Sequence, residues 1–165
     1  MYPCAELTLA RRKLELSSRV QSDLKDLCSA ALDKGATRAK AMSARRVVVD
    51  ERVRFKCRYP PCESYGKSLM CPPYTPTPEE FRRILSKYKH AVLIQTDFDV
   101  PEVMKKSLRS EGAKYVDLID EKEFSDARRK WSLETWMKLN SLVEEVERAA
   151  FGKGYYYATG FVAGT

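Results

Sequence analysis

The sequence predicts an α/β fold with a small, mostly parallel sheet flanked by helices, and an irregular loop rich in proline and cysteine. Three observations support this fold class. Several segments repeat apolar residues at the 3.6-residue period of amphipathic helices. A short apolar run at 91–94 directly follows one of them, as buried strands of α/β proteins do. A second strand-like run at 155–162 follows the longest helical segment, which completes the order strand, helix, strand of a βαβ unit.

Four segments have helical periodicity and bounding cap or terminator residues: 17–35, 78–88, 101–110 and 125–152. Residues 1–16 lack this periodicity and are expected to form an irregular lead-in. The second segment begins with the capping-box sequence Thr77-Pro78-Glu79-Glu80, which has proline at the first helical position. In the last segment one face is predicted to pack on the core, formed by Leu133, Trp136, Met137, Asn140, Val143, Val146 and Ala150.

Strands are predicted where β-branched or aromatic residues dominate. The run Val47-Val48-Val49 predicts a strand at 46–50, and 52–56 is expected to continue it as strand or extended chain. Residues 91–96 and 155–162 supply the two strands of the βαβ unit. A short segment at 115–119 fits a strand or a turn.

Length and composition indicate one folded domain. A chain of 165 residues with 44% hydrophobic residues can bury one core, so a single domain over 1–165 is expected. No apolar run approaches 18 residues, and the start lacks the apolar core of a signal peptide, so the protein is expected to be cytoplasmic, with no membrane partner. In that compartment, five cysteines indicate reduced thiols rather than disulfides.

Positive charge is concentrated in the first part of the chain. Up to Pro60 there are 14 Lys and Arg residues against 7 Asp and Glu, whereas the remainder has 16 of each. A basic segment of this kind fits an acidic partner or nucleic acid. It also fits counter-charge for an anionic metal centre. Because the basic residues are scattered and match no nucleic-acid-binding motif, nucleic acid is not the expected partner.

The segment Phe55–Pro78 holds three of the five cysteines and six of the eight prolines. Proline fixes φ and cannot donate a backbone hydrogen bond, so regular structure is not expected here. Cys57, Cys62 and Cys71 are separated by four and eight residues and form a candidate ligand set. Since metal coordination can order a loop that lacks hydrophobic contacts, the pattern predicts a metal-binding loop at about 55–78.

Two metal centres fit these cysteines. Zinc requires four ligands, and His90, the only histidine, is a candidate for the fourth. An iron–sulfur cluster accepts less regular spacings, and cysteine followed by proline, as in Cys71-Pro72, occurs in ferredoxin cluster loops. The pattern favours a 4Fe–4S cluster with one iron not bound by cysteine. A loop of three reduced cysteines without metal is the remaining alternative.

Two longer stretches carry a resemblance to a known family: VVVDERVRFKCRYPPCESYGKSLMCPPYTPTPEEF and EEVERAAFGKGYYYATGFVAG. They resemble the uncharacterised "predicted metal-binding protein" family, domain of unknown function 2284, over about residues 20–164. The resemblance implies a bound metal, with an iron–sulfur cluster as the expected form, and no known reaction. Family members typically continue with a second, cysteine-rich, ferredoxin-like segment, so the resemblance leads us to expect a member that lacks this segment, since the sequence ends at Thr165.

The sequence contains no dinucleotide-binding, Walker, zinc-protease or nucleophile-elbow motif. Three function classes remain: an iron–sulfur protein in redox chemistry, an enzyme using an open iron site, and a zinc-stabilised binding module whose basic half contacts an acidic partner or nucleic acid. Whether the chain is an enzyme stays open. A redox protein is the expected partner for the first class, and a homo-oligomer is a further expectation.

Overall fold

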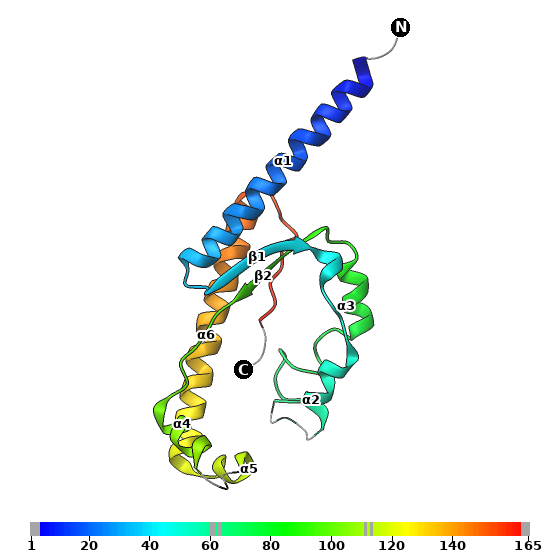
Figure 1. Ribbon diagram of the computed structural model, residues 1–165. Helices are drawn as coiled ribbons and strands as arrows, with labels where there is room; N and C mark the ends of the chain where they lie inside the picture. The colour runs from blue at the N-terminus through cyan, green and yellow to red at the C-terminus, as the bar shows by residue number, and fades with distance from the viewer. Residues whose placement is uncertain (1–3, 60–61, 63, 111, 113, 163–165) are drawn as a thin grey trace. The chain divides into compact units, whose positions relative to one another are not determined.

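The computed structural model describes residues 4–59, 62, 64–110, 112 and 114–162. Its contacts divide the chain into two compact units. The first unit comprises Met1–Lys40 and Ile94–Thr165, and the second comprises Ala41–Leu93. Figure 1 shows the path of the chain through both. Within the described residues, no helix is long and apolar enough to cross a bilayer.

Two long helices, α1 (Cys4–Asp33) and α6 (Lys122–Gly152), pack against each other in the first unit (Figure 1). Leu27 and Ala31 are buried on α1, four residues apart, and so lie on one face of the helix. The predicted end of the first helix at Gly35 is confirmed, because Gly35 has φ +103° and the Ala36 N–H donates to the Ala31 carbonyl. The expectation of an irregular lead-in at 1–16 is wrong, since α1 already begins at Cys4.

The predicted apolar face of α6 is partly wrong. The residues buried along this helix are Phe124, Thr135, Leu142, Val146 and Ala150. Leu133, Trp136 and Met137 are instead 43–58% exposed. Thr135 is accommodated in the buried position because its hydroxyl donates to the Trp131 carbonyl one turn earlier, at 2.7 Å.

A second small core lies at the start of α6. It joins Phe124 to Met104 of α4 (Glu102–Arg109) and Leu118 of α5 (Tyr115–Leu118). The short helix predicted at 101–110 is therefore confirmed. Residues 115–118 form a helical turn rather than the strand or turn considered from the sequence.

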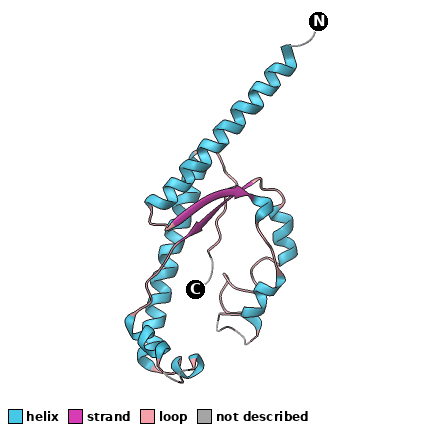
Figure 2. Ribbon diagram, viewed as in Figure 1, coloured by secondary structure: helices cyan, strands magenta, loops and turns pink. Residues whose placement is uncertain are grey.

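The prediction of a small, mostly parallel sheet is wrong. Both the relative orientation of the strands and the segments that form them differ from the prediction. The described residues form a two-stranded antiparallel sheet of β1 (Arg38–Ser43) and β2 (His90–Gln95) (Figure 2). Its ends are marked by hydrogen bonds from Thr37 N to Gln95 O and from Ala44 N to Lys89 O, at 2.9 and 3.1 Å. The strand predicted at 91–96 corresponds to β2. β1 went unpredicted because its sequence, RAKAMS, contains no β-branched residue.

The strand predicted at 155–162 is also wrong, because this segment contains turns and irregular chain. It is held against α6 through Gly160, whose N–H donates to the Glu147 carboxylate. A Cβ added at Gly160 would overlap the Val143 side chain. The aromatic residues of this segment raised its apparent strand propensity, yet in the described structure the segment does not join the sheet of β1 and β2. The predicted βαβ unit is therefore not formed.

A cluster of polar side chains ties the end of α6 to α1. Tyr155 Oη donates to the buried Asp23 carboxylate at 2.8 Å, and Lys153 Nζ donates to Asp23 and Asp26 at 3.1 and 2.6 Å. The Tyr155 hydroxyl and then Lys153 lower the pKa of Asp23 below its ordinary value of 3.8. Burial, followed by the Asp23 contact, raises the pKa of Tyr155.

Tyr155→Phe is expected to lower the free energy of unfolding at pH 7 by about 1 kcal/mol, the usual net value of one hydrogen bond. Because Asp23 has a depressed pKa in the folded state, its stabilisation is present above its ordinary value of 3.8 and is lost as the pH falls through the folded pKa. The difference between the variant and wild type should therefore be smaller at a pH below 3.8 than at pH 7. Urea unfolding at both pH values measures this.

Tyr156→Phe is the matched control, since Tyr156 is 67% exposed and contacts Phe151 through its ring. This variant should keep the stability of the wild type. If Tyr155→Phe were as harmless as Tyr156→Phe at pH 7, the polar cluster would have no stabilising role.

Candidate metal centre

The three loop cysteines all lie in the second unit. A 3-10 turn, η2 (Glu51–Arg54), leads into the short helix α2 (Phe55–Arg58), which carries Cys57. The sequence prediction of strand or extended chain at 52–56 is therefore wrong. Cys62 and Cys71 lie in the irregular chain that follows. Pro60, Pro61 and Glu63 lie outside the described residues.

Backbone hydrogen bonds connect the cysteine-bearing segments. Cys62 N–H donates to the Cys57 carbonyl at 3.1 Å, which joins the first two cysteines. Gly66 N–H donates to the Pro72 carbonyl at 2.9 Å, which joins the chain after Cys62 to the residue after Cys71. The loop is therefore folded back on itself, although it contains no strand or long helix.

The thiols themselves are accessible and unpaired with one another. Cys62 is exposed, Cys57 and Cys71 are half-buried, and none of the three forms a disulfide. Over the described residues, no three His, Cys, Asp or Glu side chains gather into a group that could hold a metal ion. The fold therefore brings the three cysteines onto one loop but does not gather them, or His90 with them, into a ligand shell.

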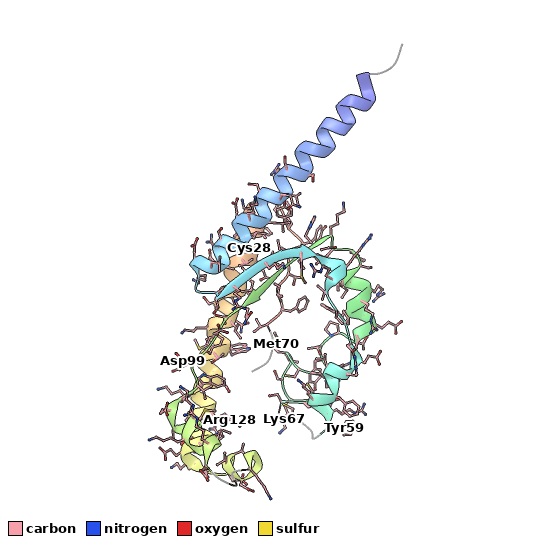
Figure 3. All side chains as sticks on the ribbon, in the orientation of Figure 1. Cys28, Tyr59, Lys67, Met70, Asp99 and Arg128 are labelled. Carbon is pink, nitrogen blue, oxygen red and sulfur yellow. The ribbon has the colours of Figure 1, made fainter. Side chains whose placement is uncertain are left out.

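Little apolar surface is buried around this loop. Phe55, Tyr59, Leu69, Met70 and Tyr74 are 56–79% exposed. Figure 3 labels two of them, Tyr59 and Met70, together with Lys67 of the same loop. Among the described residues of the second unit, Ala44 is the buried hydrophobic residue. The loop therefore lacks the hydrophobic contacts that usually order an irregular segment.

Basic residues surround the cysteines. Lys56 and Arg58 flank Cys57 and are exposed, and the Arg58 guanidinium lies 5.6 Å from the centre of the Tyr59 ring. Cysteines bind metals as anionic thiolates, so cationic side chains beside them supply counter-charge for such a centre. The donor set therefore fits a soft metal centre by its chemistry.

The helix that follows the loop, α3 (Pro78–Leu85), begins as the sequence predicts. Thr77 Oγ1 accepts from Glu80 N–H at 3.2 Å, and the Glu80 carboxylate accepts from Thr77 N–H at 2.8 Å. The backbone N–H of Thr77 and then its side chain lower the pKa of Glu80. This capping box closes the loop at its second end.

The other residues considered as ligands lie apart from this loop in the sequence. His90 is exposed at the first position of β2. Cys28 is half-buried on α1, in the first unit, as expected for a structural cysteine (Figure 3). Sequence reasoning missed Arg82, which reaches from α3 to the Val49 carbonyl at 2.9 Å and to within 3.8 Å of the Glu51 carboxylate. No sequence signal identifies such a contact across 33 residues.

Comparison with known proteins gives one match. The model of a family described as "Predicted metal-binding protein (DUF2284)" matches residues 40–165. The matched region includes Cys57, Cys62 and Cys71 and excludes all of α1. No curated protein and no solved structure matches the chain.

Proposed function

Because the chain belongs to the predicted metal-binding protein family DUF2284, we propose that Cys57, Cys62 and Cys71 bind an iron–sulfur cluster. The observation that carries the proposal is the loop itself. It places three accessible thiols on one hydrogen-bonded segment of a unit that buries very little apolar surface. Coordination would supply the order that hydrophobic contacts do not.

Two features favour a cluster over zinc. The spacing of the three cysteines lacks the paired short knuckles of structural zinc sites. A structural zinc site also needs a fourth protein ligand, and the candidate, His90, lies outside the cysteine loop on β2. A 4Fe–4S cluster held by three thiolates leaves one iron for a small ligand or a substrate.

The cluster would supply electron transfer or an open iron for cluster-dependent chemistry. Three thiolates of this chain would bind the cluster as ligands. The cationic side chains of Lys56, Arg58 and Lys67 would compensate the negative charge of the bound cluster. A reduced thiol set of this kind requires a reducing compartment, so the proposal includes a cytoplasmic location and a redox protein as partner.

Purification without air tests the proposal. The protein is expected to be brown, with iron and acid-labile sulfide in comparable amounts and visible absorbance that dithionite bleaches. Exposure to air should remove the colour with loss of iron. Colourless anaerobic protein with one zinc per chain would overturn the cluster.

Colourless protein with one zinc per chain would favour a zinc-stabilised binding module. The observation in its favour is the charge of the second unit, which has eleven Lys and Arg residues against five Asp and Glu. His90→Ala would then be the variant that tests the fourth ligand.

A further inference from the structure

One face of α6 is apolar and exposed. Leu133, Trp136 and Met137 are spaced by three and four residues, so their side chains lie next to one another on the helix surface. Their exposed fractions are 57%, 43% and 58%. Thr135 and Leu142, which are buried, lie on the opposite side of the helix. A contiguous apolar surface of this kind, with a tryptophan at its centre, is typical of a protein interface.

Charges of opposite sign flank this apolar face along the helix. Arg129 lies about one turn before Leu133, and Glu144 lies about two turns after Met137, on the same side of α6. Both side chains are exposed, and within the described structure neither forms a hydrogen bond or an ion pair. The two positions are separated by about 22 Å along the helix, so their side chains cannot meet within one chain.

This arrangement of charges is self-complementary. Consider two antiparallel α6 helices in which Trp136 of each lies opposite Met137 of the other. Arg129 then lies opposite Glu144, because each is seven residues from that central pair. A two-fold axis repeats the pair of opposite charges at the other end. One turn further out, Asp126 would lie opposite Glu147, but the Glu147 carboxylate already accepts the Gly160 N–H.

We propose that this face of α6 binds a second copy of this chain, through an antiparallel pair of α6 helices related by a two-fold axis. Leu133, Trp136 and Met137 of both copies form the apolar centre, and Arg129 pairs with Glu144 of the other copy at each end. The apolar face is small, so a dimer in the micromolar range is expected. Since α6 belongs to the first unit, dimerisation does not depend on a metal at the cysteines.

Two other occupants fit less well. A partner protein of a single charge sign would be attracted at one end of the face and repelled at the other. An anionic lipid surface binds amphipathic helices whose polar residues are basic, and Glu144 would oppose that contact. The second copy is the occupant that satisfies both ends.

Sedimentation equilibrium of the full chain at increasing concentration measures the monomer–dimer equilibrium. Trp136→Ala is expected to raise the Kd of the dimer about thirtyfold or more, the usual effect of removing a central tryptophan from an interface. Leu32→Ala is the matched control, because Leu32 is similarly exposed, at 45%, but lies on α1. This control should dimerise as wild type does. Circular dichroism checks that both variants are folded.

Charge reversal tests the antiparallel arrangement. Arg129→Glu and Glu144→Arg each place like charges at both ends of the interface and should each raise the Kd about tenfold. The double variant Arg129→Glu/Glu144→Arg restores opposite charges and should return the Kd to within about threefold of wild type. Because the two positions cannot meet within one helix, this rescue requires a second copy. Lys138→Glu, at an exposed position of α6 away from this face, should leave the Kd unchanged.

Three results would overturn the proposal. One is a wild type that stays monomeric into the millimolar range, and co-sedimentation with phosphatidylserine vesicles would then assign the face to a lipid surface. Another is an equal Kd in Trp136→Ala and wild type. The third is a double charge variant that dimerises no better than Arg129→Glu alone.

Discussion

Replacing any one of Cys57, Cys62 and Cys71 by serine is expected to reduce the iron and sulfide of anaerobically purified protein from stoichiometric amounts to background. Each cysteine supplies one of three thiolates, and a serine hydroxyl is a much poorer ligand for iron than a thiolate. Loss of one leaves two thiolates, which cannot retain a 4Fe–4S cluster. The measurements are visible absorbance and iron and sulfide assays on protein purified without air.

Cys28→Ser is the matched control, because Cys28 is half-buried on α1 of the first unit and is not part of the loop. It should keep full colour. Retention of the cluster in Cys62→Ser, the variant at the exposed thiol, would remove that residue from the ligand set. Retention in all three variants would contradict the proposed site altogether.

Cluster binding is expected to slow tryptic cleavage at Lys56, Arg58 and Lys67 by about tenfold or more, equivalent to about 1.4 kcal/mol of added local stability. These three side chains are exposed, and the loop that carries them buries little apolar surface. The structure does not gather the three thiols, so coordination must draw them together and restrict the loop. Time courses of cleavage, with fragments identified by mass spectrometry, measure the effect.

Lys130 and Lys138 on α6 serve as internal reference sites in the same digest. Their cleavage should be independent of the cluster, since they belong to the first unit. Equal protection of both sets would indicate a global change in stability. Equal cleavage of the loop with and without cluster would show that metal does not order it.

The sequence predicted helices well because their signals are local. The capping box at Thr77 and the terminator Gly35 each act through neighbouring backbone groups, and both are seen in the structure. Strands were predicted poorly because pairing depends on distant partners. RAKAMS forms β1 without strong strand propensity, whereas the strand predicted at 46–50 is wrong, because its three valines have the propensity but lie in irregular chain with no partner strand.

The candidate site was predictable in composition but not in arrangement. Cysteine count, proline content and spacing identify the loop from sequence alone. The backbone bonds from Cys62 to Cys57 and from Gly66 to Pro72 depend on how the chain turns, which spacing does not specify. The same holds for the contact of Arg82 with the Val49 carbonyl, which links α3 to a segment 33 residues earlier in the chain.

Both tryptophans of the chain lie on α6, in the first unit. Trp131 is fixed there by its indole N–H, which donates to the Asp99 carbonyl at 2.8 Å, while Trp136 is exposed. Tryptophan fluorescence, excited at a wavelength that tyrosine does not absorb, therefore reports the unfolding of the first unit and not local opening of the second. The visible absorbance of a cluster on the cysteine loop would report the second unit alone. Two optical signals followed during one denaturant titration can thus establish whether the two units unfold in a single cooperative transition or in separate steps.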